Sequence, residues 1–138
     1  MTEDRFGDSQ VAEFEARIQY RFQDCDLARV ALTHASGADD RLRSNERLEF
    51  LGDAVLGLIV CELLYRRFPH LTEGELTRLK SVIVSRASCA AIARDLGLAD
   101  FLIVGKGLAS QASLPSSLLA AAFEAVIAAI YLDGGLSA

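Results

Sequence analysis

The chain has 138 residues, of which 51% are apolar and 24% charged, and its formal net charge is −5. This length and apolar content suit one domain with a buried core, whereas the acidic balance disfavours binding of polyanions through net charge alone. The N-terminus, MTEDRFGDSQ, lacks the apolar region of a signal peptide, and Glu124 interrupts the longest apolar stretch, residues 118–132. We therefore expect a cytoplasmic domain without a membrane span.

The first part of the chain predicts two helices and a loop. Residues 1–9 are polar and are expected to be frayed. Apolar residues then recur at helical spacing from Val11, which predicts an amphipathic helix over residues 11–21. A short helix is predicted over residues 27–34. The segment SGADDRLRS, residues 36–44, is rich in turn formers and charge and predicts a loop.

The remainder predicts four more helices and no strand, so the expected fold class is all-α. A long helix over residues 45–68, capped by Ser44 or Asn45, contains AVLGLIVCELLY, which is apolar on nearly all faces and predicts burial. Thr72 and Glu75 have capping-box spacing and open a helix that continues through LTRLKSVIVS. Further helices are expected over residues 86–96 and 116–132, separated by a surface loop over residues 104–115.

Glycines and cysteines add two expectations. Gly52 and Gly57 lie inside the long helix, where glycine costs about 1 kcal/mol, so we expect close approach of a second helix, within the chain or in a dimer. The three cysteines, Cys25, Cys61 and Cys89, contain no CxxC pair and match neither a disulfide framework nor a zinc site. Buried free thiols in a reducing cytosol are expected.

The stretch NERLEFLGD contains the acidic residues that most clearly suggest a metal-binding site. Glu46, Glu49 and Asp53 are spaced i, i+3, i+7, which places them on one helix face within about 60° of arc. Apolar residues between them predict that this face lies beside a core. Converging carboxylates resist ionisation unless a cation offsets them, and a divalent ion that prefers oxygen ligands, such as magnesium, would do so.

An ordinary reading is that these acids form a solvated stripe paired with Arg43 and Arg47. Glu124 favours the metal site instead, because it lies inside AAAFEAVIAAIYL, where no neighbour in sequence neutralises it. Two helices that each place a carboxylate among apolar residues suggest one shared site.

NERLEFLGDAVL resembles the defining motif of the ribonuclease III family. The segments ALTHAS, FPHLTEGELTRLKS and LLAAAFEAVIAAIYLDGG resemble the family as well, so the similarity covers about residues 14–135. The resemblance implies a compact, all-helical endonuclease domain that forms a homodimer with two active sites along one cleft. It also implies a chain, residues 1–138, that lacks the family's final helix and its separate RNA-binding domain.

By the same resemblance, Glu49, Asp53 and Glu124 match three of the four carboxylates that bind catalytic magnesium, and Glu46 matches a further acidic position. The fourth ligand is an aspartate at the position of Ala121, whose methyl group cannot bind a metal. The implied activity is magnesium-dependent hydrolysis of double-stranded RNA by metal-activated water, with manganese as a substitute, and Ala121 is expected to impair it.

The resemblance also assigns residues to the RNA-binding cleft. Glu73 matches an acid that lines the cleft near the dimer partner. Arg78, Lys80 and Arg86 lie in one helical region and could contact RNA phosphates, with Arg41, Arg43 and Arg47 near the loop, or could form a solvated face. His34, in ALTHAS, is expected to be a hydrogen-bonded structural histidine and His70 to be exposed.

Two other function classes compete with the nuclease. A catalytically silent relative that binds RNA or acts as a scaffold is favoured by Ala121, but buried acids without a metal would cost stability. A di-iron helical bundle also clusters glutamates, but it needs Glu-x-x-His pairs. The residues three positions before His34 and His70 are Ala31 and Arg67, which excludes that class.

Overall fold

The computed structural model describes residues 7–138, and over these residues the chain is all-α, as expected. One isolated bridge between Thr33 and Ile103 is the only β pairing in the described part. The predicted polar start over residues 1–6 lies outside the described residues. In chain order the helices are α1 (Asp8–Ile18), α2 (Cys25–Ala31), α3 (Glu46–Arg67), α4 (Glu73–Ile83), α5 (Arg86–Asp95), α6 (Lys106–Ala109) and α7 (Ser116–Gly134), with 3-10 turns η1 (Ala35–Gly37), η2 (Arg41–Arg43) and η3 (Leu98–Asp100).

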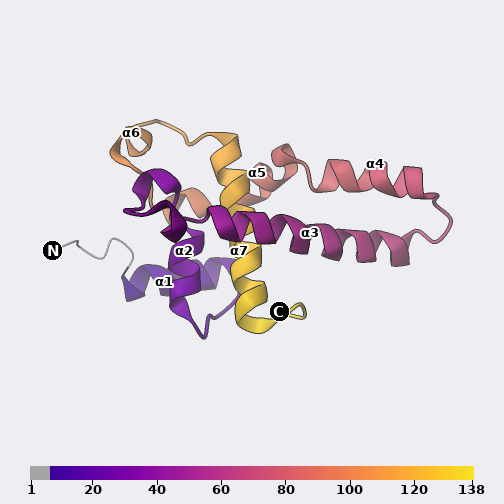
Figure 1. Cartoon of the computed structure of the whole chain (residues 1–138), viewed down its shortest axis with the longest axis horizontal. Helices are drawn as coiled ribbons and strands as arrows, with labels where there is room; N and C mark the ends of the chain where they lie inside the picture. The colour runs from indigo at the N-terminus through magenta and orange to yellow at the C-terminus, as the bar shows by residue number, and fades with distance from the viewer. Residues whose placement is uncertain (1–6) are drawn as a thin grey trace.

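Helix α7 is the centre of the core. It packs against α3, α5 and α2, and Figure 1 shows it crossing α3. Its alanines allow this close packing, since small side chains bring helix backbones together. The fully buried residues on α7 are Ala122, Ala125, Ala128 and Ala129. Phe14 from α1 completes the core, with its ring 6.3 Å from that of Phe22 and 5.6 Å from that of Phe101.

Helix α7 is also long and apolar enough to cross a membrane, with a mean hydropathy of 1.6 over its most apolar window. Core helices of soluble proteins meet the same criterion. In this structure 44% of that window is buried by the rest of the chain.

Helices α3 and α4 form an antiparallel hairpin that extends away from the other helices (Figure 1). The prediction that α3 is buried is therefore wrong for its C-terminal half. Leu48, Val55 and Leu64 are buried, but only on the side that meets the rest of the chain. The exposed apolar side chains of the hairpin are Phe50, Leu58, Ile59, Leu63, Tyr65, Leu79, Val82 and Ile83.

The start of α3 is held by buried polar groups. Asn45, 2% exposed, donates from its side-chain amide to the Ala31 carbonyl at 3.2 Å and from its backbone to the Thr33 carbonyl at 2.8 Å. Asn45 is the N-cap residue without a side-chain cap bond, and the Ser44 hydroxyl accepts from the Glu46 amide at 3.4 Å. These bonds fix the first turn of α3, which carries Glu46 and Glu49, against the end of α2.

The other end of the core is held by Asp133 on α7. Its carboxylate accepts hydrogen bonds from the Tyr20 hydroxyl at 2.7 Å and from the Gln23 and Asp24 amides, each at 2.9 Å. The Tyr20 bond, followed by the two amides, lowers the pKa of Asp133, and the same bond raises the pKa of Tyr20 to about 12. Asp133 thereby attaches the α1–α2 connection to α7.

Most element predictions are confirmed, and the differences are local. The helix predicted over residues 11–21 is α1, which begins three residues earlier and ends at Ile18, where Gln19 adopts a left-handed conformation (φ 57°). The Thr72–Glu75 capping box is present, and the last helix continues to Gly134. The two predicted loops contain the turns η1 and η2 and the short helix α6. All three cysteines are free, but Cys61 is exposed, so its predicted burial is wrong.

Candidate active site

The site is organised by the crossing of α3 and α7 at Gly52. A Cβ atom at position 52 would overlap the backbone carbonyl of Glu124, so only glycine permits this approach. The expectation of a close helix contact is confirmed at Gly52, and the partner is α7 of the same chain. It is wrong at Gly57, where a Cβ would meet only the end of the Lys80 side chain at 3.7 Å.

Because Gly52 lies between Glu49 and Asp53, the crossing brings Glu124 into the electrostatic range of both. Burial raises the pKa of Glu124 to about 7, and repulsion from Asp53 and then from Glu49 contributes, while Arg86 opposes the rise. Burial also raises the pKa of Glu49, with further repulsion from Glu46 and Asp53 and opposing effects from Arg86 and His34. The three carboxylates predicted to bind metal therefore lie within electrostatic range of one another.

These side chains are close without forming a ready-made coordination sphere. Within residues 7–138, no three histidine, cysteine, aspartate or glutamate side chains are grouped tightly enough to hold a metal ion. Ala121 lies one helical turn before Glu124 on α7 and is partly exposed, between the buried Ala120 and Ala122. Ala121 is the position at which the resemblance predicts a fourth carboxylate ligand, and its methyl group offers no oxygen.

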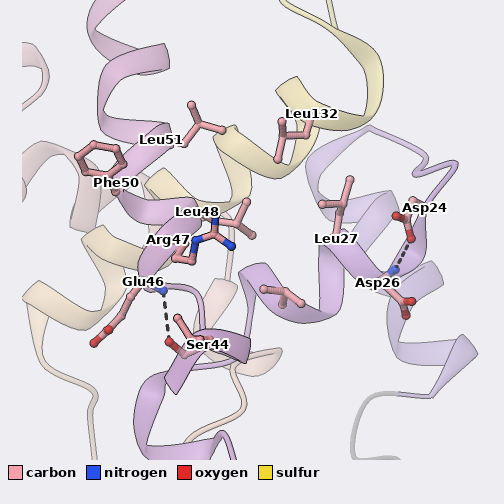
Figure 2. A pocket seen from close by; sticks show the side chains of 12 residues that line it. Asp24, Asp26, Leu27, Ser44, Glu46, Arg47, Leu48, Phe50, Leu51 and Leu132 are labelled. Carbon is pink, nitrogen blue, oxygen red and sulfur yellow. Dashed lines mark hydrogen bonds between the residues drawn. The ribbon is translucent and has the colours of Figure 1, made fainter. Parts of the chain in front are cut away.

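Glu46 is held apart from this group by Arg41. The Arg41 guanidinium donates two hydrogen bonds to the Glu46 carboxylate, at 2.7 and 2.9 Å, and these bonds lower the pKa of Glu46. The ordinary reading paired these acids with Arg43 and Arg47. Figure 2 shows the Arg47 guanidinium and the Glu46 carboxylate pointing in different directions, and the partner of Glu46 is Arg41, which the sequence suggested only as a possible phosphate contact.

His34 is a structural, hydrogen-bonded residue, as predicted. Its Nδ1 lies 2.7 Å from the Ser36 hydroxyl and accepts from the Ser36 amide at 3.1 Å, while its backbone donates to the Ile103 carbonyl at 2.9 Å. Its ring also adds, after Arg41, to the lowering of the pKa of Glu46 and opposes the rise in the pKa of Glu49. His70 is exposed, as expected.

A hollow of about 730 Å³ lies beside the first turns of α3 (Figure 2). Phe50, one of its lining residues, is 83% exposed, so the expectation that it helps to hold α3 in a core is wrong for this residue. Apolar side chains from α2, η2, α3 and α7 also line it, namely Leu27, Val30, Leu42, Leu48, Leu51 and Leu132, beside the polar residues Asp24, Asp26, Ser44, Glu46 and Arg47.

The predicted cleft residues lie on α4. Glu73 is the first residue of this helix, and with Lys80 it lines a hollow of about 470 Å³ between α3 and α4. Arg78 is exposed. These residues lie along the hairpin, away from the crossing at Gly52, and an extended substrate would be needed to contact both regions.

Comparison with known proteins agrees with this arrangement. Residues 24–138 match the family described as ribonuclease-III-like. The ribonuclease 3 of Rhodopirellula baltica is 54% identical over 139 aligned positions, which cover 96% of this chain and 52% of that protein. The chain belongs to the ribonuclease III family.

Further ribonuclease III relatives give the same result. The ribonuclease 3 of Desulfotalea psychrophila is 50% identical, with 92% of this chain and 54% of that protein covered. A solved nuclease domain of ribonuclease III from Campylobacter jejuni superimposes with a TM-score of 0.87 at 39% identity, covering 92% of this chain and 88% of that one. The chain thus spans about half the length of the curated relatives it matches.

Proposed function

We propose that this chain is the catalytic part of a cytoplasmic endoribonuclease that hydrolyses double-stranded RNA with magnesium, at a rate reduced by Ala121. The observation that carries this proposal is the convergence of Glu49, Asp53 and Glu124 where α3 and α7 cross, in a member of the ribonuclease III family. Free cysteines throughout the described residues support the reducing compartment.

The chemistry of the three side chains suits a hard divalent cation. Burial, and then repulsion from neighbouring carboxylates, raises the pKa values of Glu49 and Glu124, and a bound cation would offset both effects. All three offer oxygen only, which magnesium and manganese accept. When bound, the ion would lower the pKa of a coordinated water and stabilise charge that develops on the phosphate.

The remaining residues have distinct roles in this proposal. Glu49, Asp53 and Glu124 would hold the ion, and Glu46, fixed by Arg41, would border the site. Arg78 and Lys80 would bind the RNA backbone along α4, with Glu73 at the start of that helix. Duplex RNA is recognised mainly through shape and backbone, which suits contacts spread along an extended hairpin.

A cleavage assay tests the activity. The protein is incubated with a long RNA duplex in magnesium, in manganese and in EDTA, and the products are separated on a denaturing gel. We expect slow cleavage in magnesium, faster cleavage in manganese because manganese tolerates looser geometry, and none in EDTA. Cleavage that persists in EDTA, or fragments from single-stranded RNA alone, would contradict the proposal.

Metal should stabilise the fold in a pH-dependent way. The pKa of Glu124, about 7, lies above that of a glutamate in the unfolded chain, so protonation of Glu124 favours the folded state at low pH. The metal-free protein loses this contribution to its free energy of unfolding as pH rises through 7. Metal binding needs the ionised form, so the rise in Tm caused by millimolar magnesium or manganese should be larger at pH 8 than at pH 6.

The control for this measurement is Glu124→Gln, followed by differential scanning fluorimetry. It should reduce the metal response and weaken its pH dependence, because the amide does not titrate and Glu49 alone keeps a raised pKa. A rise in Tm that is equal in both proteins would place the metal elsewhere.

We also expect a homodimer in solution. The α3–α4 hairpin exposes more apolar surface than an isolated domain usually does, and Phe50 is its most exposed aromatic residue. The solved Campylobacter jejuni nuclease domain is described as having a flexible region involved in dimer formation. Sedimentation velocity should show a dimer at micromolar concentration.

Phe50→Ala should shift that equilibrium toward monomer. Ile92→Ala, which removes an exposed apolar side chain from α5, serves as the control and should leave it unchanged. A parent protein that sediments as a monomer at all concentrations would disprove the dimer.

A catalytically silent relative that binds RNA is the second candidate, and Ala121 is the observation that favours it. This candidate predicts duplex binding without cleavage in either metal.

A further inference from the structure

Arg86 is the first residue of α5, and it begins the side of that helix that faces the acidic group, which consists of Glu49, Asp53 and Glu124. The Ser85 hydroxyl caps this helix by accepting from the Ser88 amide. One turn later Cys89 is completely buried, and burial, Glu124 and Asp53 raise the pKa of its thiol. Positions 86 and 89 are i, i+3 and lie on the same side of the helix. The side of α5 that faces the acids therefore begins with Arg86.

Helix α5 packs along α7, which carries Glu124, and the Arg86 side chain at the start of α5 is not bound by the acids. It opposes the rise in pKa of both Glu49 and Glu124. Across residues 7–138, the ion pairs within 4.0 Å involve Arg17, Arg29, Arg41 and Arg66, not Arg86, and no side-chain hydrogen bond of Arg86 is present. Its residue is exposed, so its guanidinium donors are available to an incoming ligand.

Arg86 also lies at the junction of two predicted RNA contacts. Helix α4, with Arg78 and Lys80, ends at Ile83, three residues before α5 begins. Arg86 therefore connects in the chain the helix with the predicted RNA contacts and the helix that packs on α7. Carboxylates repel a phosphodiester, so a cation at this point would favour its approach to the site.

We propose that Arg86 is a further catalytic residue, whose guanidinium donates to a non-bridging oxygen of the phosphate that is cleaved. This inference rests on the proposed function and names a residue for it. Arginine suits the role because its planar donors match phosphate geometry and its charge persists at all working pH values. The group stabilises the negative charge that increases on the phosphate oxygens during attack.

The first test measures binding without cleavage. A short fluorescein-labelled RNA duplex is titrated with the full chain in EDTA at several KCl concentrations, and anisotropy gives the affinity. Arg86→Ala should reduce the slope of log affinity against log salt by about one, as expected for one lost phosphate contact. Arg86→Lys, which keeps the charge, should retain the slope. Arg21→Ala, an exposed arginine in the α1–α2 connection, is the charge-matched control.

The second test measures single-turnover cleavage by the Ala121→Asp protein at saturating RNA. Arg86→Ala should lower the rate by about 10- to 100-fold, and Arg86→Lys by less, because removal of one donor to a developing oxyanion has effects of that order or larger. If Arg86→Ala does not fold, Arg86→Gln, which keeps the length without the charge, replaces it in both tests.

The outcomes separate the two proposals. A salt slope and a cleavage rate for Arg86→Ala equal to those of Arg21→Ala would overturn the role of Arg86 alone. Failure of the Ala121→Asp parent to bind or cleave duplex RNA would overturn the proposed function, and the role of Arg86 with it.

Discussion

Ala121→Asp should increase magnesium-dependent cleavage of duplex RNA by at least about 10- to 100-fold, because changes in groups that merely support metal ligands already have effects of that size. Position 121 lies one turn before Glu124 on α7, so an aspartate there would project toward the same side of the helix. Its partial exposure leaves space for a carboxylate, which neither Ala120 nor Ala122 has. The measurement is a single-turnover cleavage rate in saturating magnesium.

The same substitution should have opposite effects on stability with and without metal. Burial and repulsion already raise the pKa values of Glu49 and Glu124, and in EDTA a fourth carboxylate adds to the repulsion, so Tm should fall. In magnesium, the added ligand should strengthen binding, so the metal-induced rise in Tm should exceed that of the parent. Fluorimetry in the two buffers gives both values.

Two controls distinguish a metal ligand from a general charge effect. Ala121→Asn has the same shape but no charge, and Ala99→Asp adds the same charge on the exposed turn η3. Neither should restore cleavage. Full magnesium-dependent activity of the Ala121 protein would instead show that the fourth carboxylate is dispensable or supplied by another residue, with Glu73 the first to test. A folded, dimeric Ala121→Asp protein without activity would favour the silent RNA-binding relative.

The helical elements could be predicted because their signals are local. The capping box at Thr72, the glycine after α5 and the apolar spacing in α1 each depend on residues a few positions apart. The burial of α3 could not be predicted in this way. Its sequence is apolar on nearly all faces, but burial depends on what packs against each face, and α7 covers only part of it. The exposed apolar side chains of α3, Phe50 among them, form the surface on which the homodimer prediction rests.

The acidic group was predictable only in part. The spacing of Glu49 and Asp53 indicates one helix face, and the isolation of Glu124 indicates a second helix. The pairing of Glu46 with Arg41 depends on the conformation of the loop before α3, and the proximity of Arg86 depends on how α5 packs on α7. Neither contact can be predicted from the sequence. Each brings residues together through turns whose conformation is not specified by the spacing of residues along the chain.

Gly52→Ala should destabilise the protein by about 2 kcal/mol, since overlap with a backbone atom should cost about 3 kcal/mol, the upper end of the usual overpacking range, and a helical alanine regains about 1. The added methyl would overlap the Glu124 carbonyl, which belongs to the backbone of the central helix and cannot rotate away. We expect Tm to fall by roughly 10 °C. Displacement of α7 would also separate Glu124 from Glu49 and Asp53, so the metal-induced rise in Tm should be lost together with stability.

Gly57→Ala is the matched control, because it makes the same change in the same helix. A Cβ at position 57 meets only the flexible end of Lys80 at 3.7 Å, so the better helix propensity of alanine should raise stability by up to about 1 kcal/mol. The two substitutions should therefore change Tm in opposite directions when unfolding is followed by circular dichroism. Equal stability of the two variants would show that the α3–α7 crossing does not depend on Gly52, and the convergence of the three carboxylates would then need another cause.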